Sequence, residues 1–288
     1  MDVALAQRLV AAQFPQWAGL PVRPVAADGW DNWSFRLGDD MKLRFPSAAG
    51  YAEQTAKEAE WLPRLAPHLP LPIPVPVATG EPGESYPFRW SIQRWLRGDP
   101  ASRANVPDRV QVARDVAGFI TALQAIDIGN GPPPGQHSYL RGAHPIDAYG
   151  EEAHRAVEAL TGEIDMRTAH EVLAAATESR VASPVWVHGD VAIGNLLVRD
   201  GQLAAVIDFG CMAVGDPSCD LVLAWVFLEG QARDAFRAAL PADAGLWARA
   251  RAWALWKSAL VYRDGPGNPA EHSPPEIIAA VLAEHRAG

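Results

Sequence analysis

The N-terminal third of the chain contains short runs in which apolar and polar residues alternate, a pattern typical of β-strands. Residues 22–27 and 33–37 are predicted strands joined by a turn at 28–32, and residues 41–45 are the next strand. Successive side chains of a strand point to opposite faces, so Lys42 and Arg44 share one face of that strand. A further strand is predicted over residues 91–96, followed by Arg97-Gly98-Asp99.

The stretch that follows the strand at 41–45 has apolar residues at alternating intervals of four and three, which predicts an amphipathic helix. Its stripe consists of Tyr51, Thr55, Glu58, Leu62 and Leu65. A carboxylate on such a stripe costs several kcal/mol unless it is paired with a cation. The residues alone leave Arg44 and Lys42 as possible partners of Glu58.

Proline limits two neighbouring segments. Pro63 lacks a backbone N–H, so we expect the helix to kink or stop near Leu62. Residues 69–76 read LPLPIPVP, which favours an extended connector and excludes a central strand before Val77.

The rest of the chain is mainly helical in pattern. Apolar spacing predicts a helix over residues 108–126, a break at 129–135, two helices within 144–180 and a nearly all-apolar helix over 246–262. Asp216 followed by Pro217 predicts a capped helix start, with Asp220 one turn later. Both acids are expected to hold the chain in place and not to take part in chemistry.

A hairpin interrupts this helical half. Residues 185–188 read as a short apolar strand that is broken at His188-Gly189-Asp190, and a second apolar run follows at 196–198. With Asp200-Gly201 as a two-residue turn after that run, Asn195 faces Val206, so Asp208 lies diagonally from Asn195 on the same face. Asp190 lies in the preceding loop. An amide and a carboxylate oxygen are hard ligands suited to Mg²⁺, and Asp190 is left to meet an incoming hydroxyl. The same residue types also occur at strand ends for purely local hydrogen-bonding reasons.

Composition sets limits on this interpretation. A chain of 288 residues with 49% hydrophobic content can form two domains. It shows neither a membrane-length apolar run nor a signal peptide at its start, so we expect a cytoplasmic protein. Cys211 and Cys219 are expected to be reduced packing residues. Almost all of the net charge of −9 belongs to residues 133–288, which argues against nucleic acid and is compatible with a cationic ligand.

His188-Gly189-Asp190, the following Asn195 and then Ile207-Asp208-Phe209-Gly210 resemble the aminoglycoside phosphotransferase family, which is related to the protein kinases. The resemblance implies that Asp190 is the catalytic aspartate and that Asn195 and Asp208 are magnesium ligands. Protein kinases carry arginine where Gly189 stands. Many family members have a His-Pro pair where this chain has residues 191–193. His188 is assigned a structural role.

The resemblance also implies an ATP site in the first part of the chain, although GTP is not excluded. The turn at 28–32, with Asn32 or Ser34, is positioned to cover phosphates. Arg44 held by Glu58 corresponds to the cation-glutamate pair that orients ATP phosphates. Backbone groups of Arg94, Trp95 and Leu96 occupy the hinge that would hold adenine.

The acceptor pocket of this family is made by C-terminal helices. Aromatic and acidic residues there are candidates to bind the acceptor, although tryptophan on a buried helix is usually core. These candidates are Trp225, Glu229, Trp253, Trp256 and Tyr262.

We therefore expect an α+β, bilobal protein-kinase-like fold, with a small antiparallel-sheet lobe over residues 1–96, a hinge near 94–98 and a larger, mostly helical lobe over 97–288. ATP would bind between the lobes.

The expected function is Mg²⁺- and ATP-dependent phosphorylation of a hydroxylated small molecule by a monomer or homodimer. Leading acceptors are aminoglycoside, macrolide or nucleoside antibiotics, with resistance as the outcome. A metabolic kinase for homoserine, choline or a glycated amine, or a catalytically silent nucleotide-binding regulator, is the alternative.

Overall fold

The computed structural model describes residues 1–25, 31–181, 183–241, 243–265 and 268–288. Two compact units make up the chain. The first comprises Met1–Arg97 together with Ala205–Gly210, and the second comprises Gly98–Ala204 together with Cys211–Gly288. The predicted antiparallel sheet and helical remainder are both present. No helix in the described part of the chain is both long and apolar enough to cross a membrane.

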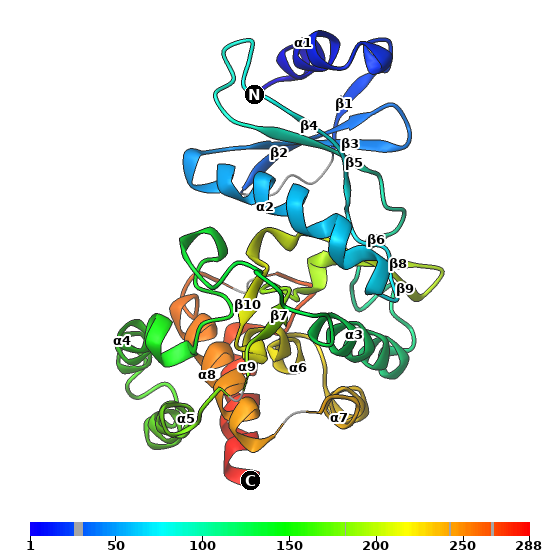
Figure 1. The fold of residues 1–288 in the computed structure, drawn as a ribbon. Coiled ribbons are helices and arrows are strands. Elements are labelled where there is room, and N and C mark those ends of the chain that lie inside the picture. Colours follow the sequence, from blue (N-terminus) through cyan, green and yellow to red (C-terminus); the bar gives the residue numbers. More distant parts are fainter. Residues whose placement is uncertain (26–30, 182, 242, 266–267) are drawn as a thin grey trace. The chain divides into compact units, whose positions relative to one another are not determined.

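The first unit is built on one five-stranded antiparallel sheet with the strand order β1-β2-β3-β5-β4. Helix α1 packs on one face of this sheet and α2 lies on the other side (Figure 1). The turn predicted at 28–32 falls mostly outside the described residues. The elements are α1 (Val3–Gln13), β1 (Val22–Pro24), β2 (Asn32–Leu37), β3 (Met41–Pro46), α2 (Ala49–Leu65), β4 (Pro76–Gly80) and β5 (Trp90–Arg94), with short 3₁₀ helices at Pro15–Trp17 and Ala66–His68.

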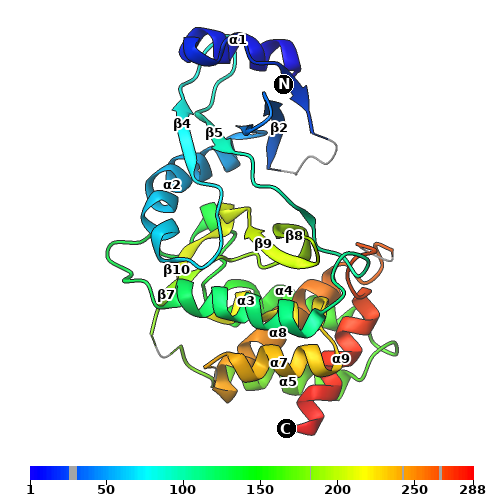
Figure 2. The ribbon, with the colours of Figure 1, turned by 90° about the vertical axis from the view of Figure 1, so that its right-hand side faces the viewer.

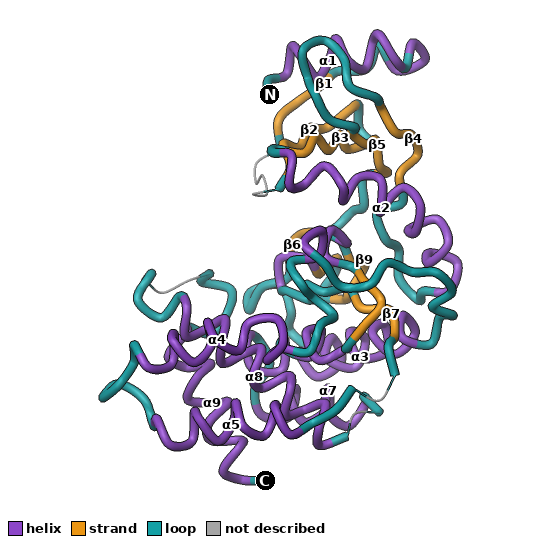
Figure 3. The backbone as a smooth tube through the Cα atoms, turned by 60° about the vertical axis from the view of Figure 1, so that its left-hand side comes forward, coloured by secondary structure: helices purple, strands orange, loops and turns teal. Residues whose placement is uncertain are grey.

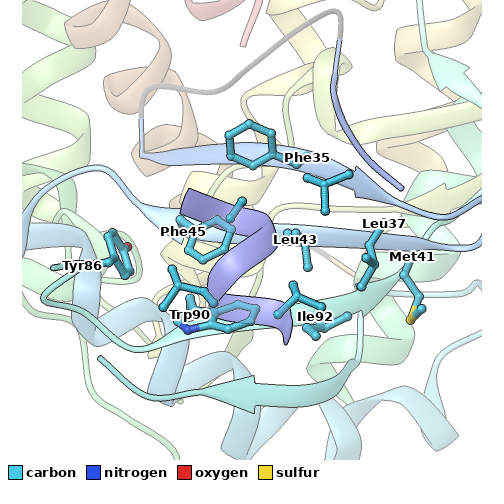
Figure 4. Packing of buried hydrophobic residues seen from close by; sticks show 12 residues of the cluster. Phe35, Leu37, Met41, Leu43, Phe45, Tyr86, Trp90 and Ile92 are labelled. Atoms are coloured by element: carbon cyan, nitrogen blue, oxygen red, sulfur yellow. The ribbon is translucent and has the colours of Figure 1, made fainter. Parts of the chain in front are cut away.

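Strand alternation gives the sheet two different faces. The apolar face forms a core in which Phe45 stacks on Trp90 and meets Tyr86 edge to face (Figure 4). Helix α1, which the sequence analysis missed, covers this face with Leu9 and Val10. The opposite face is polar and also buried; it carries Asn32, Ser34, Arg44, Ser91 and Gln93.

Pro63 does not end α2, so the predicted stop near Leu62 is wrong. The helix continues to Leu65 and then passes into the 3₁₀ helix Ala66–His68. Proline this close to the end removes one hydrogen bond, because only the last turn follows it. Burial of Leu62 and Leu65 on either side of Pro63 keeps the last turn in place.

The second unit is mostly helical, as the tube in Figure 3 shows. Helix α8 packs against α4, α5 and α9, and α3 runs beside α7 (Figure 2). The helices are α3 (Arg109–Gln124), α4 (Pro145–Glu158), α5 (Met166–Glu178), α6 (Leu223–Val226), α7 (Gly230–Ala239), α8 (Ala244–Leu260) and α9 (Pro274–Ala287), with 3₁₀ helices at Gln136–Ser138, Ile193–Asn195, Phe209–Cys211 and Pro217–Leu221.

Short strands complete this unit and carry the predicted hairpin. Asp200 and Gly201 both have left-handed φ values, +55° and +79°, as a two-residue hairpin turn of this kind requires. The strands are β6 (Asp99–Pro100), β7 (Val185–Val187), β8 (Leu196–Arg199), β9 (Gln202–Val206) and β10 (Ala213–Gly215); they form the pair β7-β10 and the sheet β6-β8-β9.

Three predictions for the second unit can be checked directly. Asp216 caps the following segment by accepting from the Ser218 N–H, as expected. The helix predicted from Pro217 is instead a 3₁₀ helix followed by the four-residue α6, so that prediction was too long. Cys211 and Cys219 are both free thiols, as expected.

We predict that Gly80→Ala strongly destabilises the protein. A Cβ at Gly80 would lie 2.0 Å from the indole of the buried Trp90, so the aromatic core would have to shift. Overpacking of this kind costs about 1–3 kcal/mol in the free energy of unfolding. Urea unfolding followed by tryptophan fluorescence measures the change. Gly50→Ala on α2, where a Cβ meets nothing within 4 Å, is the matched control and should be neutral or slightly stabilising.

Candidate active site

A buried ion pair lies on the polar face of the first unit. Arg44 Nη1 donates to both carboxylate oxygens of Glu58, at 2.8 and 2.9 Å. Gln93 Nε2 also donates to Glu58, at 3.4 Å. Of the two cations that the sequence left open, Arg44 therefore makes this pair. Burial opposes the charge of Arg44, but the carboxylates of Glu58 and Asp208 outweigh it and raise the pKa of the guanidinium.

Arg44 also contacts Asp208. Its second nitrogen, Nη2, donates to Asp208 Oδ1 at 3.1 Å, so one guanidinium binds two carboxylates. No hydrogen bond within the described residues involves Asp208 Oδ2, and the side chain is 45% exposed. Asp208 has a φ of +66°, a strained value for a residue with a side chain. Such strain is found where a functional group must be held in one direction.

Asn32 and Ser34 lie on the same polar face. Ser34 is directly opposite Arg44 in the register of β2 and β3, and Asn32 lies two residues before Ser34 on β2. Both side chains are buried. They are therefore placed near the cation predicted to contact phosphates, whereas residues 28–30 of the predicted phosphate-covering turn lie outside the described residues.

The pairing of β5 determines which backbone N–H and C=O groups of residues 94–96 are free to bind the nucleotide base. The Trp95 N–H donates to the Asp40 carbonyl at 2.8 Å, so this donor is already occupied, and the contact of residues 94–96 with a base stays a prediction. Backbone groups of neighbouring residues in a strand point to opposite sides. The Arg94 carbonyl therefore points away from β3, on the side where pairing with β4 has ended at Gln93, and Leu96 lies beyond the end of the strand. The Trp95 indole packs under the Arg36 guanidinium, 3.9 Å from the ring centroid.

The loop after β7 in the second unit is fixed by a buried carboxylate. Asp220 accepts from the N–H groups of His188 and Gly189, at 2.8 and 2.7 Å. Burial raises the pKa of Asp220, while His188 and these donors oppose the rise. His188 Nδ1 in turn accepts from the Asp190 N–H at 3.1 Å, so its predicted structural role is confirmed.

Glycine is required next to Asp190. Gly189 has a φ of +83°, and a Cβ there would lie 2.4 Å from the Cys211 carbonyl. An arginine, as found at this position in protein kinases, would not fit without moving the backbone. The departure from the kinase pattern thus has a local steric cause.

Asn195 is held by Asp190. Its side-chain Nδ2 donates to the backbone carbonyl of Asp190 at 2.9 Å and to Oδ2 at 3.0 Å. The amide nitrogen is therefore occupied, and the amide oxygen is the atom left for a cation. Asp190 keeps its other carboxylate oxygen, Oδ1, for which the described residues supply no hydrogen bond.

These donors fit Mg²⁺. Asn195 Oδ1 and Asp208 Oδ2 are hard oxygens, and this ion is commonly bound through one or two protein oxygens together with substrate phosphates. Within the described ranges no group of three or more His, Cys, Asp or Glu side chains could hold a metal by itself. That Asn195 and Asp208 share one ion stays a prediction.

The predicted acceptor residues fall into two groups. Trp225 and Trp253 are fully buried, so they are core residues and cannot contact an acceptor. Trp256 is half-buried; Tyr149 stacks on it with centroids 4.1 Å apart. Tyr262 follows the end of α8 and is half-buried as well.

Glu229 forms an ion pair with Arg109 at 3.1 Å. The pair lines a cavity of about 780 Å³ at the start of α3 and α7. An open cavity with charged walls is suited to a polar ligand. Glu229 therefore remains a candidate acceptor residue.

Sequence reasoning missed Glu271 and Tyr149. Burial raises the pKa of Glu271, Lys257 opposes this, and the negative charge of Asp190 raises the pKa further. The negative charge of Asp190 therefore acts on Glu271, although the two side chains share no hydrogen bond. Glu271 lies in the irregular segment between α8 and α9, where no periodic pattern marks it. Tyr149 is a kinked position inside α4, a feature that spacing cannot reveal.

Comparison with known proteins places this geometry in context. The sequence model of the phosphotransferase enzyme family matches residues 22–253. An aminoglycoside 3'-phosphotransferase from Escherichia coli is 26% identical over 204 residues, which cover 67% of this chain and 70% of that protein.

Solved structures share the fold. The GDP complex of wild-type aminoglycoside 2'-phosphotransferase-IIIa superposes with a TM-score of 0.66 at 19% identity, covering 100% of this chain and 99% of that one. The apoenzyme of macrolide 2'-phosphotransferase MphH from Brachybacterium faecium gives 0.62 at 24% identity, covering 98% and 97%. The fold class is therefore confirmed as protein-kinase-like. Because the family match includes the Arg44–Glu58 pair and the segment from His188 to Asp208, the chain belongs to the phosphotransferase enzyme family.

Proposed function

We propose that this phosphotransferase transfers the terminal phosphoryl group of ATP to a hydroxyl of an aminoglycoside-like antibiotic, and that resistance is the biological result. The observation that carries the proposal is the Asp190–Asn195 contact, which occupies the amide nitrogen of Asn195 and one carboxylate oxygen of Asp190 and leaves the amide oxygen for a cation and the second carboxylate oxygen for a substrate proton. GTP is included as a second donor, since the aminoglycoside 2'-phosphotransferase-IIIa that shares the fold was solved as a GDP complex.

Each residue has a defined task in the proposed reaction. Asp190 orients the acceptor hydroxyl and takes its proton as the new bond forms. Arg44, fixed by Glu58, contacts the phosphates, and Asn32 and Ser34 contribute polar contacts beside it. The Arg94 carbonyl and the Leu96 N–H hold the base. Mg²⁺ bound by Asn195 and Asp208 would neutralise negative charge on the phosphates.

A cationic acceptor is favoured by the charge of the second half of the chain and by Glu271. Burial and the charge of Asp190 raise the pKa of this carboxyl while Lys257 opposes the rise, so an ammonium group on the acceptor would be a suitable partner for it. Trp256 and Tyr149 offer an aromatic surface on which a sugar ring could pack. The name of the curated relative, an aminoglycoside phosphotransferase, supports the same class.

The direct test is a coupled assay of ADP release with Mg-ATP, run against panels of aminoglycosides, macrolides, nucleoside antibiotics and small amino alcohols. Turnover with aminoglycosides supports the proposal. Turnover only with amino alcohols would indicate a metabolic kinase instead. ATP binding without turnover on any panel would point to a nucleotide-binding regulator.

Asp190→Asn should lower kcat by at least about 100-fold, because it removes the positioned base while keeping the shape of the side chain. The Kd for Mg-ATP should change by less than about threefold. Steady-state kinetics and isothermal titration calorimetry measure the two quantities. Asp200→Asn is the matched control: this residue is 93% exposed at the hairpin turn, and asparagine tolerates its positive φ. An equal loss of ATP affinity in Asp190→Asn would contradict its role as a base.

Arg44→Lys should raise the KM for ATP by about tenfold and also lower kcat, although it preserves the charge. A lysine presents one nitrogen and cannot bond Glu58 and Asp208 as the guanidinium does. Initial-rate kinetics at saturating acceptor measure the effect. Arg23→Lys, on the exposed side of β1, should behave like the wild type. Wild-type kinetics in Arg44→Lys would show that the second contact has no catalytic value.

Glu271→Gln should raise the KM for an amine-bearing acceptor by about tenfold with little change in kcat, since one charged contact is worth about 1.5–3 kcal/mol. The raised pKa of Glu271 adds a pH dependence. As the pH falls through that raised pKa the carboxylate is protonated, so the acceptor KM of the wild type should rise, whereas the variant should lack this rise. Glu151→Gln, an exposed acid on α4, is the control. An unchanged KM would place the amine elsewhere.

A further inference from the structure

Helix α2 carries a buried cation next to Glu58. The side chain of Lys57 is buried, and its ammonium donates to the Gly210 carbonyl at 2.7 Å. A buried ammonium is costly unless it is well hydrogen-bonded, so a lysine kept here indicates that the contact has a purpose. Gly210 follows Asp208 by two residues, and both belong to the first unit.

The segment that contains Asp208 is held at three places by this unit. The Val206 N–H donates to the Pro72 carbonyl at 3.2 Å, Arg44 bonds the Asp208 side chain, and Lys57 bonds the backbone at Gly210. These contacts lie before, at and after the strained residue. A backbone with a φ of +66° at Asp208 persists only when its surroundings fix it in this way.

Close packing on α2 supports the same arrangement. Gln54, one turn before Lys57 on α2, packs so tightly on Gly210 that a Cβ there would lie 2.8 Å from Gln54 Oε1. Residues three and four apart share a helix face, so Gln54 presents the same side of α2 as Lys57 and Glu58. One face of α2 thus contacts both the phosphate-binding arginine and the segment of the predicted metal ligand.

We propose that Lys57 is a positioning residue for Asp208, which it fixes through the backbone of Gly210 in the direction needed to bind Mg²⁺. This inference rests on the proposed function, in which Asp208 is a metal ligand. Arg44 holds the carboxylate by one oxygen, and Lys57 prevents the backbone from turning away. Arg44 and Lys57 together fix the direction of Asp208 Oδ2, and neither of them is hydrogen-bonded to that oxygen.

The test measures how much Mg²⁺ tightens ATP binding. The Kd for ATP is determined by isothermal titration calorimetry with excess Mg²⁺ and with EDTA, and their ratio is the magnesium enhancement. Lys57→Met should lose about tenfold of this enhancement, the usual effect of removing a group that orients a metal ligand, while the Kd in EDTA stays within about twofold. Lys57→Arg, which keeps a charged donor, should recover most of the enhancement. In kinetics, kcat should fall with the acceptor KM unchanged.

Matched variants separate positioning from simple stabilisation. Leu65→Ala removes a buried side chain from the same helix at a site remote from Gly210, so it should lower the Tm and leave the enhancement unchanged. Arg64→Met, on the exposed side of α2, should change neither quantity. If Lys57→Met does not fold, Lys57→Gln, which keeps a hydrogen-bond donor, is compared in its place.

Two outcomes would overturn the inference. One is an unchanged magnesium enhancement in Lys57→Met; the other is an equal loss of enhancement in Leu65→Ala at a similar Tm, which would make Lys57 a stabilising residue only. Failure of the proposed function gives a different pattern. In that case the wild type itself binds ATP no more tightly with Mg²⁺ than with EDTA, and no acceptor is phosphorylated.

Discussion

A guanidinium bonded to two carboxylates fixes the polar side of the first unit. Arg44 has the sheet behind it, Glu58 of α2 on one nitrogen and Asp208 on the other. Arg44 comes from a strand, Glu58 from a helix and Asp208 from a distant segment of the chain. Their ion pairs therefore determine how these three parts of the first unit meet. Buried ion pairs seldom add net stability, since desolvation offsets much of their attraction. Here the ion pair matters for geometry, because the hydrogen bonds of Arg44 to Glu58 and Asp208 form only when the three side chains are correctly placed.

The second unit uses carboxylates in the same manner. Asp220 binds two backbone N–H groups of the loop that carries Asp190, and Asp216 accepts from the buried Arg249 at 2.8 Å. Arg249 also donates to the Arg180 carbonyl, at the far end of α5, so α8 is tied to the segment just before β7. The carboxylate of Asp190 therefore lies on a loop whose backbone is held by buried hydrogen bonds. The proposed role of Asp190 as a base requires preorganisation of this kind.

Much of this arrangement could be predicted from the sequence because it depends on local spacing. The hairpin turn at Asp200-Gly201 and the pairing of Glu58 with a strand cation both follow from patterns within about twenty residues. The contact between Lys57 and Gly210 joins residues 153 apart, and no periodicity indicates it. Trp253 was misassigned for another reason. A helix that is apolar nearly all round does not reveal which of its faces is covered, so aromatic residues in the core and at the surface look alike.

The use of arginine in place of lysine at position 44 affects how this protein can be studied and inhibited. Acylating reagents that mark kinases attack the neutral amine of the lysine beside the phosphates. A guanidinium stays protonated and does not react in that way, and the carboxylates around Arg44 raise its pKa further. A chemical survey that finds kinases through that lysine would overlook this enzyme. Inhibitors for it must instead use shape and hydrogen bonds, which an arginine can donate.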